Sequence, residues 1–533
     1  MSAPVLQVAD LRVEIGSREI VRGVGFQVEP EGTLGIVGES GSGKSMTVLA
    51  ATGLLDAPGA RVDGSSVLAG DRGGVELVGA RPGVLRRVHG DRVGFVFQDP
   101  STSLNPLLTL ERQITESLEA HRNLTRRAAA GRAVELFEAV GLPDVQRRMH
   151  AYPHQLSGGQ RQRVMIAIAL ACDPALLIAD EPTTALDVTT QAQIIELVGT
   201  LQRERGTAVV WISHDLGVIG QVADDVLVLR HGEALEHRDV VELMDDPRHP
   251  YTRELLAARP RLGASAPPPA DDDGEVLLRV AELDVRFPVA SAAGRSIVHA
   301  VDDVSFEVRR GRTLGIVGES GSGKSTIANV LTGLVRPTSG SADLAGEDVL
   351  HRASRDLRRR IAMVFQDPFS SLDPRMRVGE AIAEPLRVHR LPSDGRSRLD
   401  RVAELLALVD LPEHFAQRYP HELSGGQRQR ISIARALALE PELIILDEST
   451  ASLDVSIQAR VLELLRRLQG ELGLTFLFIA HDLAVVQQMS HDVLVMQHGR
   501  VVEHAPATEL FAHPREDYTR ALLAAIPPDR PHP

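Results

Sequence analysis

The chain has 533 residues, of which 43% are hydrophobic and 24% are charged, and its formal net charge is −14. These proportions are those of an ordinary globular protein, and the length predicts more than one domain. The negative charge and an aromatic content of 3% argue against a general nucleic-acid-binding surface, so we expect no nucleic-acid partner. The single cysteine, Cys172, excludes an intrachain disulfide and a cysteine-ligated cluster. The most apolar stretch, 164–179, contains Asp173 and Pro174, so we expect no membrane span.

A glycine-rich segment at residues 33–45, TLGIVGESGSGKS, recurs unchanged at 313–325. Both copies fit the pattern G-x-x-x-x-G-K-[ST] of a phosphate-binding loop (P-loop), in which backbone N–H groups and a lysine hold phosphates and a hydroxyl binds Mg²⁺. We expect an apolar strand before each loop and a helix after it, which reaches Leu55 in the first copy. The sequence therefore predicts two nucleotide-binding sites. Their predicted binding residues are Gly38, Ser40, Gly41, Gly43, Lys44, Ser45 and Met46, and then Gly318, Ser320, Gly321, Gly323, Lys324, Ser325 and Thr326.

The duplication predicts two domains, at residues 1–260 and 276–533. Between them, residues 261–275 (RLGASAPPPADDDGE) have the composition of an exposed linker. Short apolar runs occur at matching places in both halves, at 93–97, 175–179 and 208–212, and at 361–365, 443–446 and 475–479. Such strands alternating with helical stretches predict an α/β fold with a mostly parallel sheet. Charged helical patterns at 104–155 and 372–422 predict a helical insert in each domain.

Further motifs repeat in the same order. The pentapeptide LSGGQ occurs at 156–160 and at 423–427, each time before a helical run. Ser157 and Ser424 can cap these helices, or the turn can offer its hydroxyl and N–H groups to an anion. An ordinary helix cap does not explain the same pentapeptide in both halves.

Acidic pairs then close a strand in each half, Asp180 with Glu181 and Asp447 with Glu448. Beside a P-loop, the aspartate suits Mg²⁺ and the glutamate can polarise an attacking water. The motifs TALD (184–187) and ASLD (451–454) follow, and a later strand ends at His214 or His481. Gln98 and Gln366 each end an earlier strand, where an amide can bind metal or water.

These motifs, in this order and in both halves, resemble the ATP-binding-cassette ATPases. The resemblance implies two tandem P-loop cassettes, each with a RecA-like α/β core and an α-helical subdomain, and it implies ATP and Mg²⁺ as ligands. It also implies head-to-tail pairing of the cassettes within one molecule. ATP at Lys44 is then closed by Ser424 and Gly426, and ATP at Lys324 by Ser157 and Gly159.

The resemblance also assigns roles to single residues. Glu181 and Glu448 are the expected general bases, and His214 and His481, with Gln98 and Gln366, complete the expected catalytic set. The expected Mg²⁺ ligands are Ser45, Gln98, Asp180, Ser325, Gln366 and Asp447. Aligning 8–15 with 280–287 places Ile15 opposite Phe287, where this family stacks an aromatic ring on adenine. Only the second site is then expected to have that ring. The alternative is that Phe287 is a strand residue packed inward, with Ile15 as its apolar equivalent.

Longer segments narrow the resemblance to importers of dipeptides, oligopeptides, glutathione and nickel. They are FQDPSTSLNPLLTL (97–110), FQDPFSSLDPRMRV (365–378), YPHQLSGGQRQR (152–163), YPHELSGGQRQR (419–430) and the tails at 249–260 and 517–527. This implies a peripheral ATPase on the cytoplasmic face of the cell membrane, with two permease subunits as partners and a substrate-binding protein as an indirect one. Coupling helices of the permeases are expected near 98–110 and 366–378, where Leu104 and Leu372 are candidate contacts. The alternative is that these leucines pack inside the helical inserts. Many relatives add a cysteine-rich segment, which this chain lacks.

Other cassette proteins fit less well. Tandem cassettes that act on ribosomes have a longer charged linker and smaller helical inserts, and DNA-repair cassettes need zinc cysteines or a long coiled coil. Tandem sugar-importer ATPases are nearer, but their second cassette usually lacks intact motifs, and both are intact here. The transported substrate is not encoded in these motifs.

Overall fold

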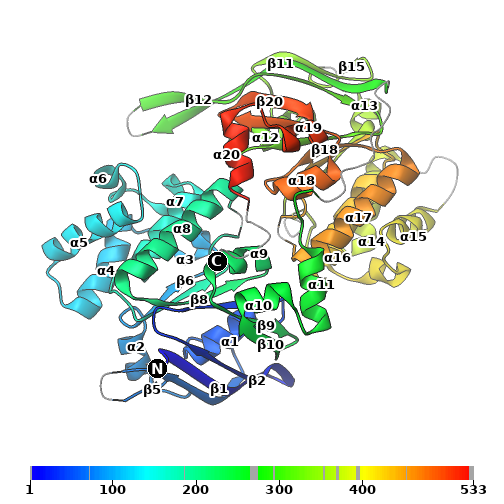
Figure 1. Ribbon diagram of the computed structural model, residues 1–533. Coiled ribbons are helices and arrows are strands. Elements are labelled where there is room, and N and C mark those ends of the chain that lie inside the picture. Colours follow the sequence, from blue (N-terminus) through cyan, green and yellow to red (C-terminus); the bar gives the residue numbers. More distant parts are fainter. Residues whose placement is uncertain are drawn as a thin grey trace.

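The computed structural model describes residues 3–70, 73–184, 186–263, 274–291, 294–351, 354–367, 371–391, 397–451 and 453–526. The predicted linker lies largely outside these residues, so its bounds stay a prediction. In Figure 1 the first half occupies the lower left and the second half the upper right, and the two meet along the centre of the molecule.

Each half contains the same ten strands in the same order. In the first half they are β1 (Leu6–Ile15), β2 (Arg18–Val28), β3 (Thr33–Val37), β4 (Ala60–Leu68), β5 (Val75–Glu76), β6 (Val93–Val96), β7 (Leu176–Asp180), β8 (Ala208–Ser213), β9 (Asp225–Arg230) and β10 (Glu233–Asp239). In the second half they are β11 (Val276–Ser291), β12 (Gly294–Arg309), β13 (Thr313–Val317), β14 (Ser339–Leu344), β15 (Glu347–Asp348), β16 (Ile361–Val364), β17 (Leu443–Asp447), β18 (Thr475–Ile479), β19 (Asp492–Gln497) and β20 (Arg500–Pro506).

The helices repeat as well. The first half has α1 (Lys44–Ala51), α2 (Pro82–Val88), α3 (Pro100–Ser103), α4 (Leu110–Arg122), α5 (Arg126–Ala139), α6 (Val145–Arg148), α7 (Gly158–Ala169), α8 (Val188–Arg205), α9 (Leu216–Val222), α10 (Val240–Asp245) and α11 (Pro250–Ala258). The second half has α12 (Lys324–Leu331), α13 (Arg355–Arg360), α14 (Val378–His389), α15 (Arg398–Leu408), α16 (Gly425–Leu437), α17 (Val455–Leu472), α18 (Leu483–Met489), α19 (Ala507–Ala512) and α20 (Asp517–Ala524). Short 3₁₀ turns lie at Pro153–Gln155, Glu413–Gln417 and Pro420–Glu422.

Two sheets form each half. The larger has the order β10-β9-β3-β8-β7-β6, and its counterpart has β20-β19-β13-β18-β17-β16. Its strands are parallel except at one edge, where β10 and β20 run antiparallel to their neighbours. The smaller sheets, β2-β1-β4-β5 and β12-β11-β14-β15, are antiparallel. The α/β fold with a mostly parallel sheet is thus confirmed, and the apolar runs at 93–97, 175–179 and 208–212 are its strands β6, β7 and β8.

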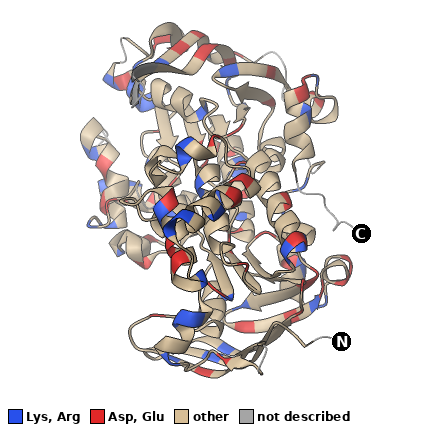
Figure 2. Cartoon of the chain, turned by 90° about the vertical axis from the view of Figure 1, so that its left-hand side faces the viewer, with Lys and Arg blue, Asp and Glu red and all other residues tan. Residues whose placement is uncertain are grey.

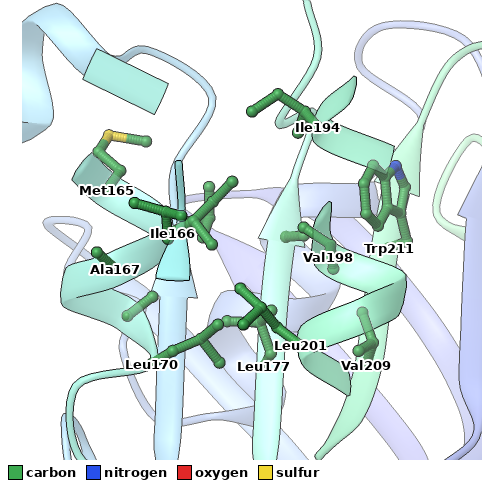
Figure 3. Packing of buried hydrophobic residues seen from close by; sticks show 14 of the residues in the cluster. Met165, Ile166, Ala167, Leu170, Leu177, Ile194, Val198, Leu201, Val209 and Trp211 are labelled. Carbon is green, nitrogen blue, oxygen red and sulfur yellow. The ribbon is translucent and has the colours of Figure 1, made fainter. Parts of the chain in front are cut away.

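The core of each half has two layers. One apolar cluster fills the space between the two sheets, and the other joins the opposite face of the parallel sheet to the helices. Figure 3 shows the second layer in the first half, where Ile166 of α7, Leu170 just after that helix and Val198 of α8 pack on Leu177 of β7 and Trp211 of β8. This packing fixes α7, and therefore the LSGGQ turn at its start, relative to the catalytic strand ends.

The helical inserts are confirmed, with α4 to α6 in the first half and α14 and α15 in the second. The helix after the first P-loop is shorter than expected, because α1 ends at Ala51 and Gly53 then takes a positive φ of 71°. Leu55 therefore lies beyond this helix. Among the described residues, no helix combines the length and apolarity that crossing a bilayer requires.

Candidate functional site

The P-loops follow the central strands β3 and β13. Gly38 and Gly318 have φ values of 155° and 149°, and a Cβ atom there would lie 2.2 and 2.1 Å from the carbonyl oxygens of Leu229 and Met496. Only glycine fits such an approach of two backbones. Gly43 and Gly323 also have positive φ and begin the helices α1 and α12. The loop backbone therefore faces the helix N-terminus, the arrangement that suits phosphate.

The P-loop lysines are folded into their own loops. Lys44 Nζ donates to the carbonyl oxygens of Gly38 at 2.7 Å and Glu39 at 3.1 Å, and Lys324 Nζ makes the same two bonds at 2.7 and 2.8 Å. Burial lowers the pKa of both lysines, while nearby carboxylates act in the opposite direction. The short hydrogen bonds of these buried cations go to neutral carbonyls, and Glu181 lies 4.0 Å from Lys44 Nζ, so a phosphate would add negative charge close to each cation. The residues present therefore fit a nucleotide phosphate.

A hydroxyl and a carboxylate lie side by side next to each lysine. Ser45 Oγ donates to Asp180 Oδ1 at 3.0 Å, and Ser325 Oγ donates to Asp447 Oδ1 at 2.9 Å. Burial raises the pKa of both aspartates. Hydroxyl, carboxylate and amide oxygens are the hard ligands that Mg²⁺ prefers, and a cation would compensate the buried carboxylates. This donor set fits Mg²⁺.

Glu181 and Glu448 follow the carboxyl ends of β7 and β17 in a left-handed conformation, with φ of 46° and 45°. Such a backbone is costly outside glycine and occurs at functional sites. Their backbone N–H groups still pair with the adjacent strand, at Ile212 O and Ile479 O. The strand end is thus held in the sheet while the chain turns at the glutamate.

Glutamine and histidine contact each of these glutamates. Gln98 Nε2 donates to Glu181 Oε2 at 3.0 Å, and His214 Nδ1 lies 3.4 Å from the same oxygen. In the second half, Gln366 Nε2 donates to Glu448 Oε2 at 2.6 Å, and His481 Nδ1 lies 3.9 Å away. The glutamine, glutamate and histidine expected from separate motifs therefore meet in both halves.

Burial alone would raise the pKa of Glu181, but His214, followed by Lys44 and Thr184, outweighs it and lowers the pKa to about 2. The pKa of Glu448 is also lowered, chiefly by its interaction with the nearby His481. In return, both histidines have a raised pKa, because the glutamate outweighs their burial. Each glutamate is therefore ionised at neutral pH.

The two halves contact each other crosswise at these sites. Asp454 of the second half accepts from Ser40 N of the first P-loop at 2.7 Å. Asp187 of the first half accepts from Ser320 N of the second P-loop at 3.3 Å. A cavity of about 130 Å³ lies between the halves and is lined by His214, Glu448 and His481 among others. The loop after each acidic pair therefore touches the P-loop of the opposite half.

Comparison with known proteins finds the same family in both halves of the chain. The model of the ABC transporter family matches residues 21–184 and 301–451. The chain belongs to this family. A second model, the oligopeptide/dipeptide transporter C-terminal region, matches residues 235–278 and 502–533. The protein is thus an ABC ATPase in which each of two cassettes ends in this C-terminal region.

Named relatives extend over nearly the whole chain. The glutathione import ATP-binding protein GsiA of Escherichia coli (strain K12) is 48% identical, over 96% of this chain and 87% of that protein. The peptidoglycan transport ATP-binding protein YejF of Agrobacterium fabrum is 46% identical, over 98% of this chain and 96% of that protein. Both match the two cassettes together, so the tandem arrangement is shared.

The LSGGQ serines cap their own helices. The hydroxyl of Ser157 accepts from Gln160 N, and that of Ser424 accepts from Gln427 N. In each case the side-chain oxygen of the glutamine accepts a hydrogen bond from the N–H of the serine. The capping interpretation from the sequence is therefore confirmed. Anion binding by the same turns, which include Gly159 and Gly426, stays a prediction.

The structure aligns the two hairpins as the sequence predicts. Val13 of β1 and Val285 of β11 are both buried, and Ile15 and Phe287 lie two residues further along. Phe287 is 38% exposed, whereas Ile15 packs partly against the core. An exposed Phe287 opposes the alternative that its ring packs inward. Its contact with adenine stays a prediction. Next to the P-loops, Met46 and Thr326 are half-buried in α1 and α12.

The expectation that Leu104 and Leu372 are docking contacts is wrong. Their side chains are 3% and 2% exposed and belong to the helical-layer cores. In the same segment, Leu107 is 82% exposed. An alternating apolar pattern does not distinguish a residue that packs inward from one three positions later that faces outward.

Two sets of contacts were not predicted as functional. Asp187 and Asp454 end the repeated TALD and ASLD motifs, so the repetition was a usable signal. Tyr251 and Tyr518 also repeat, in the tails at 249–260 and 517–527 that narrow the resemblance, but no role was predicted for them. Their contacts with the P-loops depend on folding that joins residues more than 190 positions apart.

Proposed function

We propose that the chain binds two ATP molecules at composite sites shared by its two cassettes. The observation that carries this proposal is the crosswise contact of Asp454 with Ser40 and of Asp187 with Ser320. Asp454 and the second LSGGQ turn belong to the same half, since α16 packs on α17, which Asp454 precedes. ATP at Lys44 is therefore enclosed by Ser424 and Gly426, and ATP at Lys324 by Ser157 and Gly159.

The proposed hydrolysis uses the ionised glutamates. At the first site, Glu181 accepts a proton from the attacking water, and His214 and Gln98 hold the glutamate and the water in line with the γ-phosphate. Glu448, His481 and Gln366 do the same at the second site. Ser45 with Asp180 and Gln98, and Ser325 with Asp447 and Gln366, would hold Mg²⁺, which neutralises charge on the phosphates.

We further propose that hydrolysis drives an importer of peptides or similar small substrates. The C-terminal regions of both cassettes support this substrate class, as do the glutathione import protein and the peptidoglycan transport protein among the relatives. Two integral-membrane permease subunits form the pathway, and their coupling helices contact the cassettes on the cytoplasmic face of the membrane. An extracytoplasmic binding protein supplies substrate to the permeases.

The double variant Glu181→Gln with Glu448→Gln tests the assignment. It keeps the phosphate contacts and removes both bases, so we expect ATP binding close to that of the wild type and hydrolysis at least ~10²-fold slower. Hydrolysis is measured as phosphate release, and binding with a fluorescent ATP analogue. Wild-type turnover in the double variant would show that these glutamates are not the bases. Stimulation of the wild-type ATPase by permeases reconstituted with a peptide-binding protein tests the importer assignment separately.

A further inference from the structure

The C-terminal tail of each half contacts the P-loop of the same half. Tyr251 of α11 accepts, through its hydroxyl, a hydrogen bond from Glu39 N at 3.0 Å. Tyr518 of α20 accepts from Glu319 N at 3.1 Å. Glu39 and Glu319 each follow the first glycine of their P-loop. The same contact thus forms twice, between segments about 200 residues apart in sequence.

The contacted residue also holds the P-loop lysine. The carbonyl oxygen of Glu39 accepts from Lys44 Nζ at 3.1 Å, and that of Glu319 accepts from Lys324 Nζ at 2.8 Å. The N–H of Glu39 lies in the same planar peptide group as the carbonyl of Gly38, which accepts from Lys44 Nζ at 2.7 Å, so a hydroxyl that fixes this N–H also restricts that carbonyl. The position of the lysine follows from both.

A buried glutamate fastens the first tail to the sheet. Glu236 of β10 accepts from Arg248 N at 2.9 Å, from His249 N at 3.1 Å and from Thr252 Oγ1 at 2.7 Å. Burial alone would raise the pKa of Glu236, but these bonds outweigh it and lower the pKa. The carboxylate is ionised, so its bonds are charge-assisted and stronger than neutral ones.

The second tail is fastened in a similar way, by two backbone N–H groups. Glu503 of β20 accepts from Arg515 N at 2.9 Å and from Glu516 N at 3.2 Å. Glu236 and Glu503 lie on strands that join the P-loop strands β3 and β13 through one intervening strand. Each tail is therefore rigidly connected to the strand that ends in the P-loop.

The tyrosine side chain is held in place as well. Tyr251 is 1% exposed, and the guanidinium of Arg230 lies 4.4 Å from the centre of its ring. Burial raises the pKa of Tyr251 and of Tyr518 to about 12, so both hydroxyls stay neutral at ordinary pH. A buried, neutral hydroxyl on a fixed ring is a suitable fixed acceptor for a loop N–H.

We propose that Tyr251 and Tyr518 are positioning residues that hold the two P-loops in their phosphate-binding shape, and that bracing the P-loop is a function of the C-terminal region in which each lies. Without the hydroxyl, the loop populates shapes that bind ATP poorly, and the apparent affinity falls by the fraction of loops in the competent shape. The inference rests on ATP binding at the two P-loops and not on the importer assignment.

The test uses Tyr251→Phe and Tyr518→Phe in the full chain, since phenylalanine keeps the ring and removes only the hydroxyl. ATP affinity is measured with a fluorescent ATP analogue while the opposite P-loop is silenced by Lys324→Ala or Lys44→Ala. We expect Tyr251→Phe to weaken the Lys44 site about five- to tenfold and to change the Lys324 site less than about twofold, and Tyr518→Phe to do the reverse. Each variant is thus the matched control for the other.

Steady-state kinetics distinguish positioning from a loss of folded protein. A loosened loop raises KM for ATP more than it lowers kcat, whereas partial unfolding lowers kcat and leaves KM unchanged. The proposal would be overturned if both tyrosine variants left the ATP affinity and the KM of their own sites within about twofold of the wild-type values. A wild-type chain that binds no ATP would overturn both this proposal and the composite ATP sites.

Discussion

Contacts between the halves differ at the two ATP sites at the level of single residues. At the first site, Ser456 of the second half donates to Glu39 at 2.6 Å, and Asp454 accepts from Ser40 N at 2.7 Å. At the second site, Thr189 occupies the position of Ser456, and its buried hydroxyl has no hydrogen-bond partner among the described residues. The Asp187 contact there is longer, at 3.3 Å. The first P-loop is therefore held more closely by the opposite half.

The paired histidines predict a dependence of stability on pH. The pKa of His214 and of His481 is raised in the folded chain, so their contribution to stability is complete below the unfolded value of about 6.5 and is lost as pH rises through the raised value. We expect the thermal midpoint to fall between pH 6 and 9 by a few degrees, at about 2–4 °C per kcal/mol for domains of this size.

The double variant His214→Gln with His481→Gln removes these titrating groups. Its thermal midpoint should vary less over the same pH range, as followed by circular dichroism. Equal slopes for the variant and the wild type would mean that other groups cause the pH dependence. The glutamate partners act in a different range, since the lowered pKa of Glu181 makes its contribution disappear only as pH falls from about 4.5 towards 2.

Phe287 and Ile15 predict unequal ATP affinities. An aromatic ring that stacks on adenine contributes on the order of 1 kcal/mol beyond its buried area, so the Lys324 site should bind ATP several-fold more tightly than the Lys44 site. Phe287→Ala should remove this difference, and Ile15→Phe should tighten the first site. Site-specific affinities, with the opposite P-loop silenced, provide the measurement. Equal affinities that Phe287→Ala leaves unchanged would refute the asymmetry.

At the scale of elements, short sequence patterns predicted the strands of the parallel sheets and the two P-loops. Apolar runs predicted β6, β7 and β8 and their counterparts, because a buried parallel strand is apolar on both faces. The P-loops were recognisable because their glycines are required by close backbone approach. The end of α1 was placed too late, since the apolar pattern continues past Gly53. The tail contacts of Tyr251 and Tyr518 could not be predicted, because they depend on how β10 and β20 position distant segments.

The segment after Gln98 predicts separable effects of two neighbouring leucines. Leu104→Asp places an unpaired charge in the core of the helical layer, and we expect a loss of at least about 3 kcal/mol of stability together with basal hydrolysis. Leu107→Asp changes an exposed side chain, so basal hydrolysis should stay near the wild-type rate while stimulation by permeases falls. Arg375 occupies the matching position in the second half, and Arg375→Asp tests whether the two segments contact their permeases equally. Full stimulation of Leu107→Asp would exclude this leucine from the docking surface.

At the scale of the whole molecule, the tail of the first half also contacts the second half. Figure 1 shows α11 beside α17 of the opposite half, and Glu254 of α11 lies 3.2 Å from Arg460 of α17. In α20 the matching position is Ala521, and Ile526 stands where the first tail has Arg259. Figure 2 shows acidic and basic side chains mixed over the face that it presents. The Glu254–Arg460 pair therefore has no equivalent at the second tail, and it makes the pairing of the two halves asymmetric.

Joining both cassettes in one chain predicts kinetics that do not depend on protein concentration. A linker of about 15 residues keeps the halves at an effective concentration in the millimolar range, far above that of a dilute assay. Phosphate release per molecule should therefore be constant from nanomolar to micromolar protein. A protease site inserted within 261–275 provides the matched control, because after cleavage the halves can separate and hydrolysis per molecule should fall on dilution. The exposed Glu254–Arg460 pair is too weak to prevent this separation, since such pairs contribute about 0–1 kcal/mol. Specific activity of the intact chain that rises with concentration would instead indicate that ATP sites form between two molecules.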